Sequence, residues 1–245
     1  FNYGLDFLDK SLAGADFPIV CANIATQMGA DPTRDTTYLK PYVILDREVE
    51  TGGGEKHPIR VGIIGFVPPQ IMNWDRRHLA GKANARDIVS AAQAWVPEMK
   101  DAGADIIVAL SHSGIDAADR SDGMENASLH LADVDGIDAL FTGHHHLVFP
   151  GPKYADLPGI DAEKGTLFGK PAAMGGFWGS HLGIIDLMLQ RDGDSWKITS
   201  FTSTAPSIYE RDGRKVIPVV EDQQDVLDSV AKDHEETLAY VRRAV

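Results

Sequence analysis

Two apolar runs of the sequence each end in a polar loop that contains glycine and histidine, and this arrangement constrains the fold more than any other feature. Residues 105–110 lead into a Ser-His-Ser-Gly loop, and residues 137–142 lead into a Gly-His-His-His loop. Short apolar runs bounded by such loops are typical of buried strands. Helical patterns at residues 84–102 and 125–132 alternate with these runs, and this alternation predicts a layered α/β domain.

The rest of the pattern indicates further elements on both sides of this βαβ-like centre. Residues 42–50 and 59–66 are predicted to form a hairpin around three consecutive glycines, and Pro97 is expected to kink or split the helix at residues 84–102. The other predicted elements are helices at residues 4–13 and 225–243 and strands at residues 17–23, 172–174, 181–190 and 196–204.

The histidines of the two loops are candidate metal ligands. Binding sites in open α/β sheets form beyond the carboxyl ends of the strands. We therefore expect residues 105–110 and 137–142 to be adjacent parallel strands, with the rings of His112 and His144 close enough to share one metal. His146 follows in the second loop. A neutral imidazole is a good ligand for borderline divalent metals.

His145 lies between two of these candidates. In an extended loop, successive side chains point to opposite sides, so His144 and His146 would face one way and His145 the other. Two interpretations of His145 stay open: a residue that faces the substrate, or an exposed loop residue without a role.

Composition excludes some classes of partner. The formal net charge of -13 repels polyanions and argues against a nucleic-acid polymer, whereas a bound metal would supply local positive charge for a small phosphorylated substrate. No run reaches the roughly 18 apolar residues of a membrane span, and no signal peptide opens the sequence. The one cysteine, Cys21, lies in an apolar segment and is expected to be a buried thiol.

Several motifs resemble those of the calcineurin-like metallophosphoesterases. The Gly-His-His-His loop fits the Gly-His-x-His signature of that superfamily, and Ser111-His112 fits its upstream histidine. Four further segments are similar to the bacterial 2′,3′-cyclic-nucleotide 2′-phosphodiesterase/3′-nucleotidase branch: residues 1–4, 125–127, 149–151 and 177–183. The resemblance implies an α/β fold, namely a layered α/β/β/α metallophosphoesterase sandwich.

The resemblance also implies a centre of two divalent metal ions, Zn, Mn or Fe, in the intact protein. By similarity, His112 and His144 would bind one metal and His146 the other. A shell of nitrogen and oxygen donors suits each of these metals, so the sequence does not choose among them.

Other site residues follow from the same resemblance. Asn2 would orient the catalytic histidine of the family and Asn126 would contact the substrate, as His145 would on the first interpretation given above. Asn126 is equally well explained as a residue at a helix start. Phe177 and Trp178 would flank the site, although aromatic residues before a strand more often belong to the core.

Some motifs of the superfamily do not occur here in the expected order. The Asp-x-His, Gly-Asp-x-x-Asp and Gly-Asn-His motifs supply the bridging aspartate and other ligands, so we expect an N-terminally truncated domain that binds metal weakly or not at all. Residues 1–220 would form the larger, C-terminal part of a catalytic domain, and residues 221–245 a helix that leads toward a further nucleotidase domain. Uncovered apolar surface would favour a dimer.

The resemblance implies hydrolysis of 2′,3′-cyclic nucleotides and 3′-nucleotides by a hydroxide that the metal pair activates. One alternative is a 5′-nucleotidase or nucleotide-sugar hydrolase of the same superfamily. A second alternative belongs to another class: an inert structural fragment that hydrolyses nothing. Resemblance alone suggests a periplasmic location.

Overall fold

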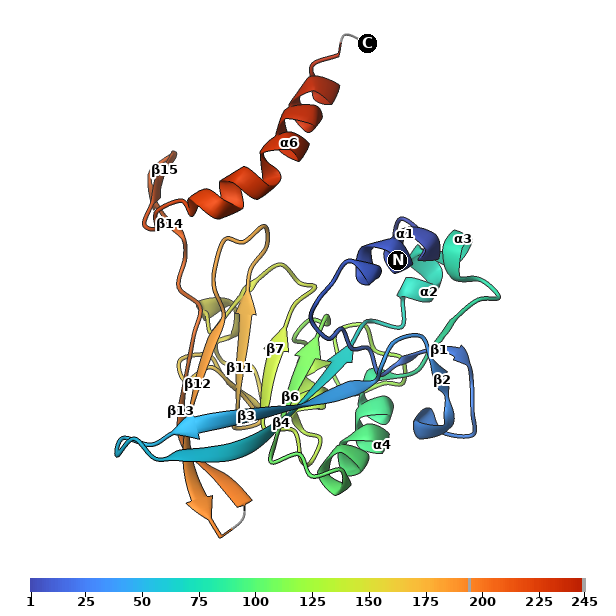
Figure 1. The fold of residues 1–245 in the computed structure, drawn as a ribbon, viewed down its shortest axis with the longest axis vertical. Helices are drawn as coiled ribbons and strands as arrows, with labels where there is room; N and C mark the ends of the chain where they lie inside the picture. Colours follow the sequence, from blue (N-terminus) through green and yellow to red (C-terminus); the bar gives the residue numbers. More distant parts are fainter. Residues whose placement is uncertain (194, 244–245) are drawn as a thin grey trace. The chain divides into compact units, whose positions relative to one another are not determined.

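The computed structural model describes residues 1–193 and 195–243 (Figure 1). The chain separates into two compact units, Phe1–Pro206 and Ser207–Val245. The predicted division after residue 220 concerns the boundary of a catalytic domain, and it stays a prediction.

A mixed sheet of eight strands forms the centre of the first unit, in the order β3-β4-β6-β7-β11-β10-β9 with β8 beside β11. Strands β4, β6, β7 and β11 run parallel to one another, and β3 is antiparallel to β4. The strands are β3 (Tyr42–Glu50), β4 (Lys56–Phe66), β6 (Ile106–Ser111), β7 (Ala139–Thr142), β8 (Val148–Phe149), β9 (Ile160–Asp161), β10 (Thr166–Leu167) and β11 (Lys170–Gly175). The predicted α/β class and the predicted parallel pairing of the two apolar runs are therefore confirmed.

Helix α4 (Ile88–Asp101) contributes one side of the main core. Its apolar residues recur at helical spacing and pack in one cluster with Ile107 and Ala109 of β6, both of which are fully buried. Asp87 caps the helix by accepting a hydrogen bond from the Ser90 N–H at 2.8 Å. The helix begins later than predicted because residues 84–85 pair with β1 as strand β5, and Pro97 lies inside it without splitting it.

The predicted strand at residues 17–23 is wrong. Only Val20 makes an isolated bridge, and strand β1 starts afterwards, at Ile24–Gln27. Only the end of this segment is buried: Phe17 is 66% exposed, whereas Cys21, Ala22 and Asn23 are buried, and the Ala22 N–H donates to the Gly65 carbonyl of β4 at 2.7 Å. Part of an apolar run can thus be buried without forming a regular strand. Cys21 is 5% exposed, as predicted, and burial raises the pKa of its thiol to about 11.

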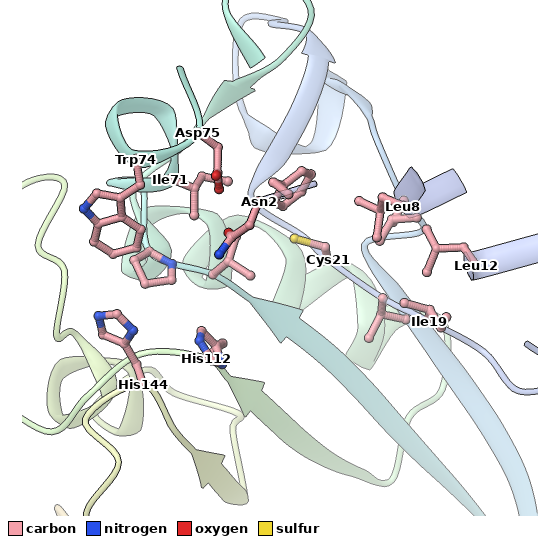
Figure 2. A pocket seen from close by; sticks show the side chains of 15 residues that line it. Asn2, Leu8, Leu12, Ile19, Cys21, Ile71, Trp74, Asp75, His112 and His144 are labelled. Atoms are coloured by element: carbon pink, nitrogen blue, oxygen red, sulfur yellow. The ribbon is translucent and has the colours of Figure 1, made fainter. Parts of the chain in front are cut away.

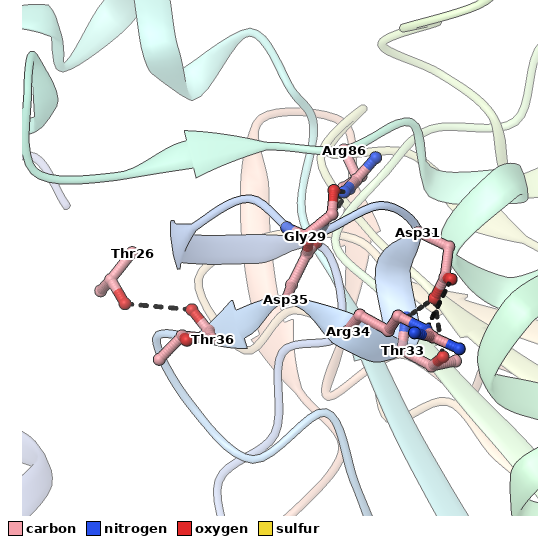
Figure 3. A network of polar contacts seen from close by, with 8 residues as sticks. All are labelled: Thr26, Gly29, Asp31, Thr33, Arg34, Asp35, Thr36 and Arg86. Carbon is pink, nitrogen blue, oxygen red and sulfur yellow. Dashed lines mark hydrogen bonds and ion pairs between the residues drawn. The ribbon is translucent and has the colours of Figure 1, made fainter.

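A buried ion pair fixes the small sheet β2-β1-β5 (Thr36–Thr37, Ile24–Gln27 and Asn84–Ala85). Arg86 donates two hydrogen bonds to the Asp35 carboxylate, at 2.8 and 2.7 Å, and one to the Gly29 carbonyl at 2.8 Å (Figure 3). The Gly29 N–H donates to the same carboxylate at 2.6 Å. The Asp35 side chain is only 1% exposed, so this bidentate pair is shielded from water.

The other elements complete both units. The first unit also contains α1 (Leu5–Ala13), the short 3₁₀ helices Pro32–Arg34 and Pro152–Tyr154, α2 (Ile71–Trp74), α3 (Arg76–Leu79), α5 (Ser128–Ala132) and the hairpin β12–β13 (Ile184–Asp192, Ser195–Thr204). The second unit contains the hairpin β14–β15 (Tyr209–Asp212, Lys215–Pro218) and helix α6 (Gln224–Val241). Among the described residues, no helix combines the length and the apolar character that crossing a bilayer requires.

Candidate metal and substrate site

The site lies at the carboxyl edge of the neighbouring strands β6 and β7. The His112 N–H continues the sheet by donating to the Phe66 carbonyl of β4 at 2.9 Å, and the second histidine loop starts directly after β7. The ring centroids of His112 and His144 lie 5.5 Å apart at an angle of 61° (Figure 2). The two imidazoles therefore lie side by side, which agrees with the predicted geometry.

The loop that carries the three histidines is not extended, so the predicted alternation of their side chains is wrong. His144 and His146 have φ values of 67° and 55°, in the left-handed region that non-glycine residues rarely adopt. As a result, the rings of His144 and His145 are stacked, with centroids 6.4 Å apart at an angle of 21°. Backbone strain of this kind concentrates at functional sites, where the surrounding structure maintains it.

His145 is half-buried, so the interpretation as an exposed loop residue is wrong. Its Nδ1 atom is buried and has no hydrogen-bond partner among the described residues, and the same holds for Oδ1 of Asn126. Both side chains lie against Gly114, where an added Cβ would be 2.5 Å from Asn126 Oδ1 and 2.6 Å from the His145 ring. Glycine at this position is thus what allows the two residues to meet.

The structure does not place Asn126 at the start of a helix. The N-cap position of α5 belongs to Ala127, which makes no side-chain cap hydrogen bond. Neither Asn126 nor His145 lines the cavity beside His112 and His144. Their predicted contacts with substrate stay predictions.

His146 lies at an aromatic edge of the site. Its ring stacks on Phe177 with centroids 5.6 Å apart at an angle of 21°, and Phe177 contacts Trp178 in turn. Phe177 is 44% and Trp178 is 94% exposed, so neither belongs to the core. The interpretation of these two aromatic residues as core is therefore wrong, and their place beside the site stays a prediction.

A cavity of about 480 Å³ opens beside His112 and His144. Figure 2 shows that Trp74, Asp75 and Asn2 line it near the two histidines, whereas Leu8, Leu12 and Ile19 line its far side. Asn2 therefore lies in the same cavity as the candidate ligands, and its catalytic role stays a prediction.

Three residues of this site were not predicted from the sequence. Trp74 stacks on His144 with centroids 5.4 Å apart at an angle of 25°, and Asp75 lines the cavity beside it. Oε1 of Glu125 lies 2.7 Å from Nε2 of His144. Helix α2 is too short to show a periodic pattern, so the sequence carries no signal for Trp74. Glu125 lies in the segment 125–127, whose similarity to the family could have pointed to it, although the sequence analysis assigned Glu125 no role.

Electrostatics favour a neutral imidazole at His112 and at His145. The pKa of His112 lies below its ordinary value, first because surrounding protein atoms remove part of its hydration and then because His144 and His146 repel its positive charge. Burial and His144 lower the pKa of His145 in the same way, although Asp116 and Glu125 act against this shift. Neutral imidazole is the form that binds a metal.

The donor set fits part of a metal shell. Two imidazoles at one edge suit a borderline divalent metal. Within residues 1–193 and 195–243, however, no group of three or more His, Cys, Asp or Glu side chains is arranged to hold an ion. His112 and His144 therefore provide nitrogen donors, and further ligands are needed to complete a shell.

Comparison with known proteins relates the whole chain to phosphoesterases. The calcineurin-like phosphoesterase YfkN from Bacillus subtilis is 42% identical, and its crystal structure matches with a TM-score of 0.88 over 99% of this chain and 69% of that one. The 5′-nucleotidase precursor from Thermus thermophilus, with a TM-score of 0.63 and 19% identity, shares the fold. No family model matches the chain. This chain belongs to the calcineurin-like phosphoesterases, as its motifs predict.

Within this family, the chain is similar to enzymes that act on nucleotides. It is 42% identical over 245 residues to the 2′,3′-cyclic-nucleotide 2′-phosphodiesterase/3′-nucleotidase of Salmonella typhimurium. It is 42% identical over 246 residues to the trifunctional nucleotide phosphoesterase protein YfkN of Bacillus subtilis. The chain spans 37% of the length of the first relative and 16% of the second.

Proposed function

We propose that the protein hydrolyses nucleotide phosphoesters, namely 2′,3′-cyclic nucleotides and 3′-nucleotides, in a metal-dependent reaction. The observation that carries this proposal is the placement of His112 and His144, with rings 5.5 Å apart, at the carboxyl edge of two parallel strands beside a cavity. The names of the relatives support the substrate class, because the similarity covers the whole chain.

The metal part of the proposal assigns His112 and His144 to one divalent ion and His146 to a second, each ion being Zn, Mn or Fe. Bound there, such ions would supply positive charge for the phosphoryl oxygens and lower the pKa of a water molecule. Phe177 would hold the His146 ring by stacking on one of its faces. Asn2, in the same cavity, would orient a neighbouring group of the intact site.

The proposed reaction has two hydrolytic steps. In the first, a water oxygen attacks phosphorus, the bond from phosphorus to the 2′ oxygen breaks, and that oxygen takes up a proton, which leaves a 3′-phosphate. In the second, another water molecule attacks, the bond to the 3′ oxygen breaks, and the products are a nucleoside and phosphate. Asn126 and His145 are the proposed substrate contacts.

A second candidate concerns the chain by itself. No complete metal shell is present within the described residues, and this favours an isolated chain that hydrolyses nothing. The alternative of a 5′-nucleotidase or nucleotide-sugar hydrolase has weaker support, because the 5′-nucleotidase of 19% identity shares only the fold.

Product analysis tests these proposals. The full product of the gene and the 245-residue chain would each be incubated with 2′,3′-cyclic AMP, 3′-AMP and 5′-AMP in the presence of Zn²⁺ or Mn²⁺. We expect the full product to consume the first two and to form 3′-AMP transiently. Consumption of 5′-AMP alone would favour the 5′-nucleotidase alternative, and activity of the 245-residue chain would exclude an inert fragment.

We propose a periplasmic location and a dimer as further properties of the intact protein. The first rests on resemblance alone, and the second rests on exposed apolar side chains such as those of Leu182 and Met188, each 62% exposed. Cell fractionation and light scattering of the purified protein test them in turn.

A further inference from the structure

Three side chains hold the His144 ring, and two of them come from other segments of the chain. Trp74 of α2 stacks on it with centroids 5.4 Å apart, and His145 is stacked at 6.4 Å. Oε1 of Glu125 lies 2.7 Å from its Nε2 atom. Two stacking neighbours set the plane of the imidazole, and the carboxylate sets its rotation within that plane.

The carboxylate also determines which ring nitrogen carries the proton. An ionised carboxylate only accepts hydrogen bonds, so Nε2 of His144 must donate to Glu125. In the neutral ring the lone pair then belongs to Nδ1, which is the nitrogen left for another partner. The neighbouring ring of His112, 5.5 Å away, lies at the same side of the cavity (Figure 2).

Glu125 is itself held in place by the loop that follows His112. Ser113, which is completely buried, donates its hydroxyl hydrogen to the Glu125 carbonyl at 2.7 Å and accepts from the Ala127 N–H at 2.7 Å. The Ser128 hydroxyl donates to the Ser113 carbonyl at 2.8 Å. Ser113, the residue directly after His112, therefore fixes the backbone of Glu125, and Glu125 in turn orients His144.

We infer that Glu125 is a positioning residue that holds His144 as the Nε2–H tautomer, so that Nδ1 is the nitrogen available to a metal beside His112. The inference rests on the proposed metal-dependent function. A hydrogen bond from the second nitrogen of a ligating histidine to a carboxylate fixes the tautomer and raises the basicity of the ligand.

Nuclear magnetic resonance of the metal-free 245-residue chain tests the tautomer directly. With ¹⁵N-labelled histidine, long-range ¹H–¹⁵N spectra show which nitrogen is protonated, and the loss of signals in His144→Gln identifies His144. We expect a single Nε2–H tautomer in the wild type and averaged tautomers in Glu125→Ala. Glu125→Gln should recover the wild-type pattern in part, because its amide oxygen still accepts.

The matched control is Asp122→Ala, which removes a nearby acidic side chain that is 95% exposed and contacts Arg120 rather than a histidine. This variant should keep the wild-type tautomer. A wild-type His144 protonated at Nδ1, or an unchanged tautomer in Glu125→Ala, would overturn the inference. Neither outcome depends on catalytic activity.

Calorimetric titration of the full gene product with Zn²⁺ separates this inference from the proposed function. Glu125→Ala should weaken binding by about 10–100-fold, and His144→Ala should weaken it further. Equal binding by wild type and Glu125→Ala, with a loss in His144→Ala, would refute the inference and leave the metal site standing. Unchanged binding in His144→Ala would instead refute the metal assignment of the proposed function.

Discussion

Ser111 of β6 lies opposite Thr142 of β7 in a parallel register, so the two strands end at the same level of the sheet. The residues that follow them therefore leave the sheet at one edge and in the same direction. This places His112 and His144 beside each other, although they are 32 residues apart in the sequence (144 minus 112). Glu125, between them in the chain, reaches back to His144.

Removing the loop histidines should abolish turnover in the full gene product. His112→Ala, His144→Ala and His146→Ala each remove a proposed ligand, so kcat should fall by orders of magnitude, because two metals act as a unit. His145→Ala should have a milder effect. Steady-state rates on bis(p-nitrophenyl) phosphate measure this, and near-wild-type turnover by His144→Ala at saturating metal would contradict the assigned role.

The 245-residue chain should bind metal weakly. Because the described residues bring no three or more His, Cys, Asp or Glu side chains together around an ion, the charge of two dications would stay uncompensated, so we expect at most one ion of low occupancy near His112 and His144. Elemental analysis of the purified chain measures the stoichiometry, and mass spectrometry of the same sample establishes that no other peptide is attached. Two tightly held ions per chain would show that other residues build the centre.

Truncating Trp74 should slow the reaction without unfolding the protein. Trp74 is 51% exposed and contacts His144 by stacking, so its removal frees the ring more than it disturbs the core. An aromatic pair contributes about 0.5–1.5 kcal/mol, which corresponds to a loss of up to about tenfold in kcat/KM for Trp74→Ala. Trp74→Phe is the matched control and should retain most activity; equal losses in both variants would exclude a stacking role.

Replacing Gly114 by alanine should disturb the packing of His145 and Asn126. The new Cβ would lie 2.5 Å from Asn126 Oδ1, and overpacking of this kind costs about 1–3 kcal/mol. Gly52→Ala is the control, because no atom lies within 4 Å of the new Cβ there. Urea unfolding measures both free energies, and equal stabilities of the two variants would contradict this description of the site.

The Asp35–Arg86 pair should make stability depend on pH in acid. Burial alone would raise the pKa of Asp35, but the hydrogen bonds and charge of Arg86, together with the Gly29 N–H, outweigh it and hold the pKa below its ordinary value of 3.8. The carboxylate therefore stabilises the folded state above pH 3.8, and this contribution is lost as the pH falls through the lower folded-state pKa.

Asp35→Asn should thus cost about 3 kcal/mol at pH 7, because it leaves a largely buried guanidinium without its charge partner. The difference from wild type should shrink as the pH falls below 3.8. Asp46→Asn serves as the control: its side chain is 85% exposed and pairs with Arg60, so it should cost less than about 1 kcal/mol. Urea titrations at several pH values measure this, and a constant difference at all pH values would contradict it.

The sequence by itself determined the fold class and the position of the candidate ligands. Apolar runs followed by glycine and histidine predicted the strands β6 and β7, and their alternation with helices predicted parallel pairing. These features are local, because strand and helix periodicity are visible within a short window of residues. The motifs around His112 and His144 also predicted the family, which the comparisons confirmed.

Only the tertiary structure decided how the histidines are oriented and what surrounds them. The positive φ values of His144 and His146 brought the His145 ring back against Gly114, which an assumed extended loop did not allow. Likewise, residues 17–23 look like a strand, but only their last three residues are buried, where the Ala22 N–H donates to the Gly65 carbonyl of β4. Trp74 and Glu125 reach His144 from distant segments. Such contacts depend on how helices, strands and loops pack against one another. They produce no periodic pattern of residues, so the sequence alone does not predict them.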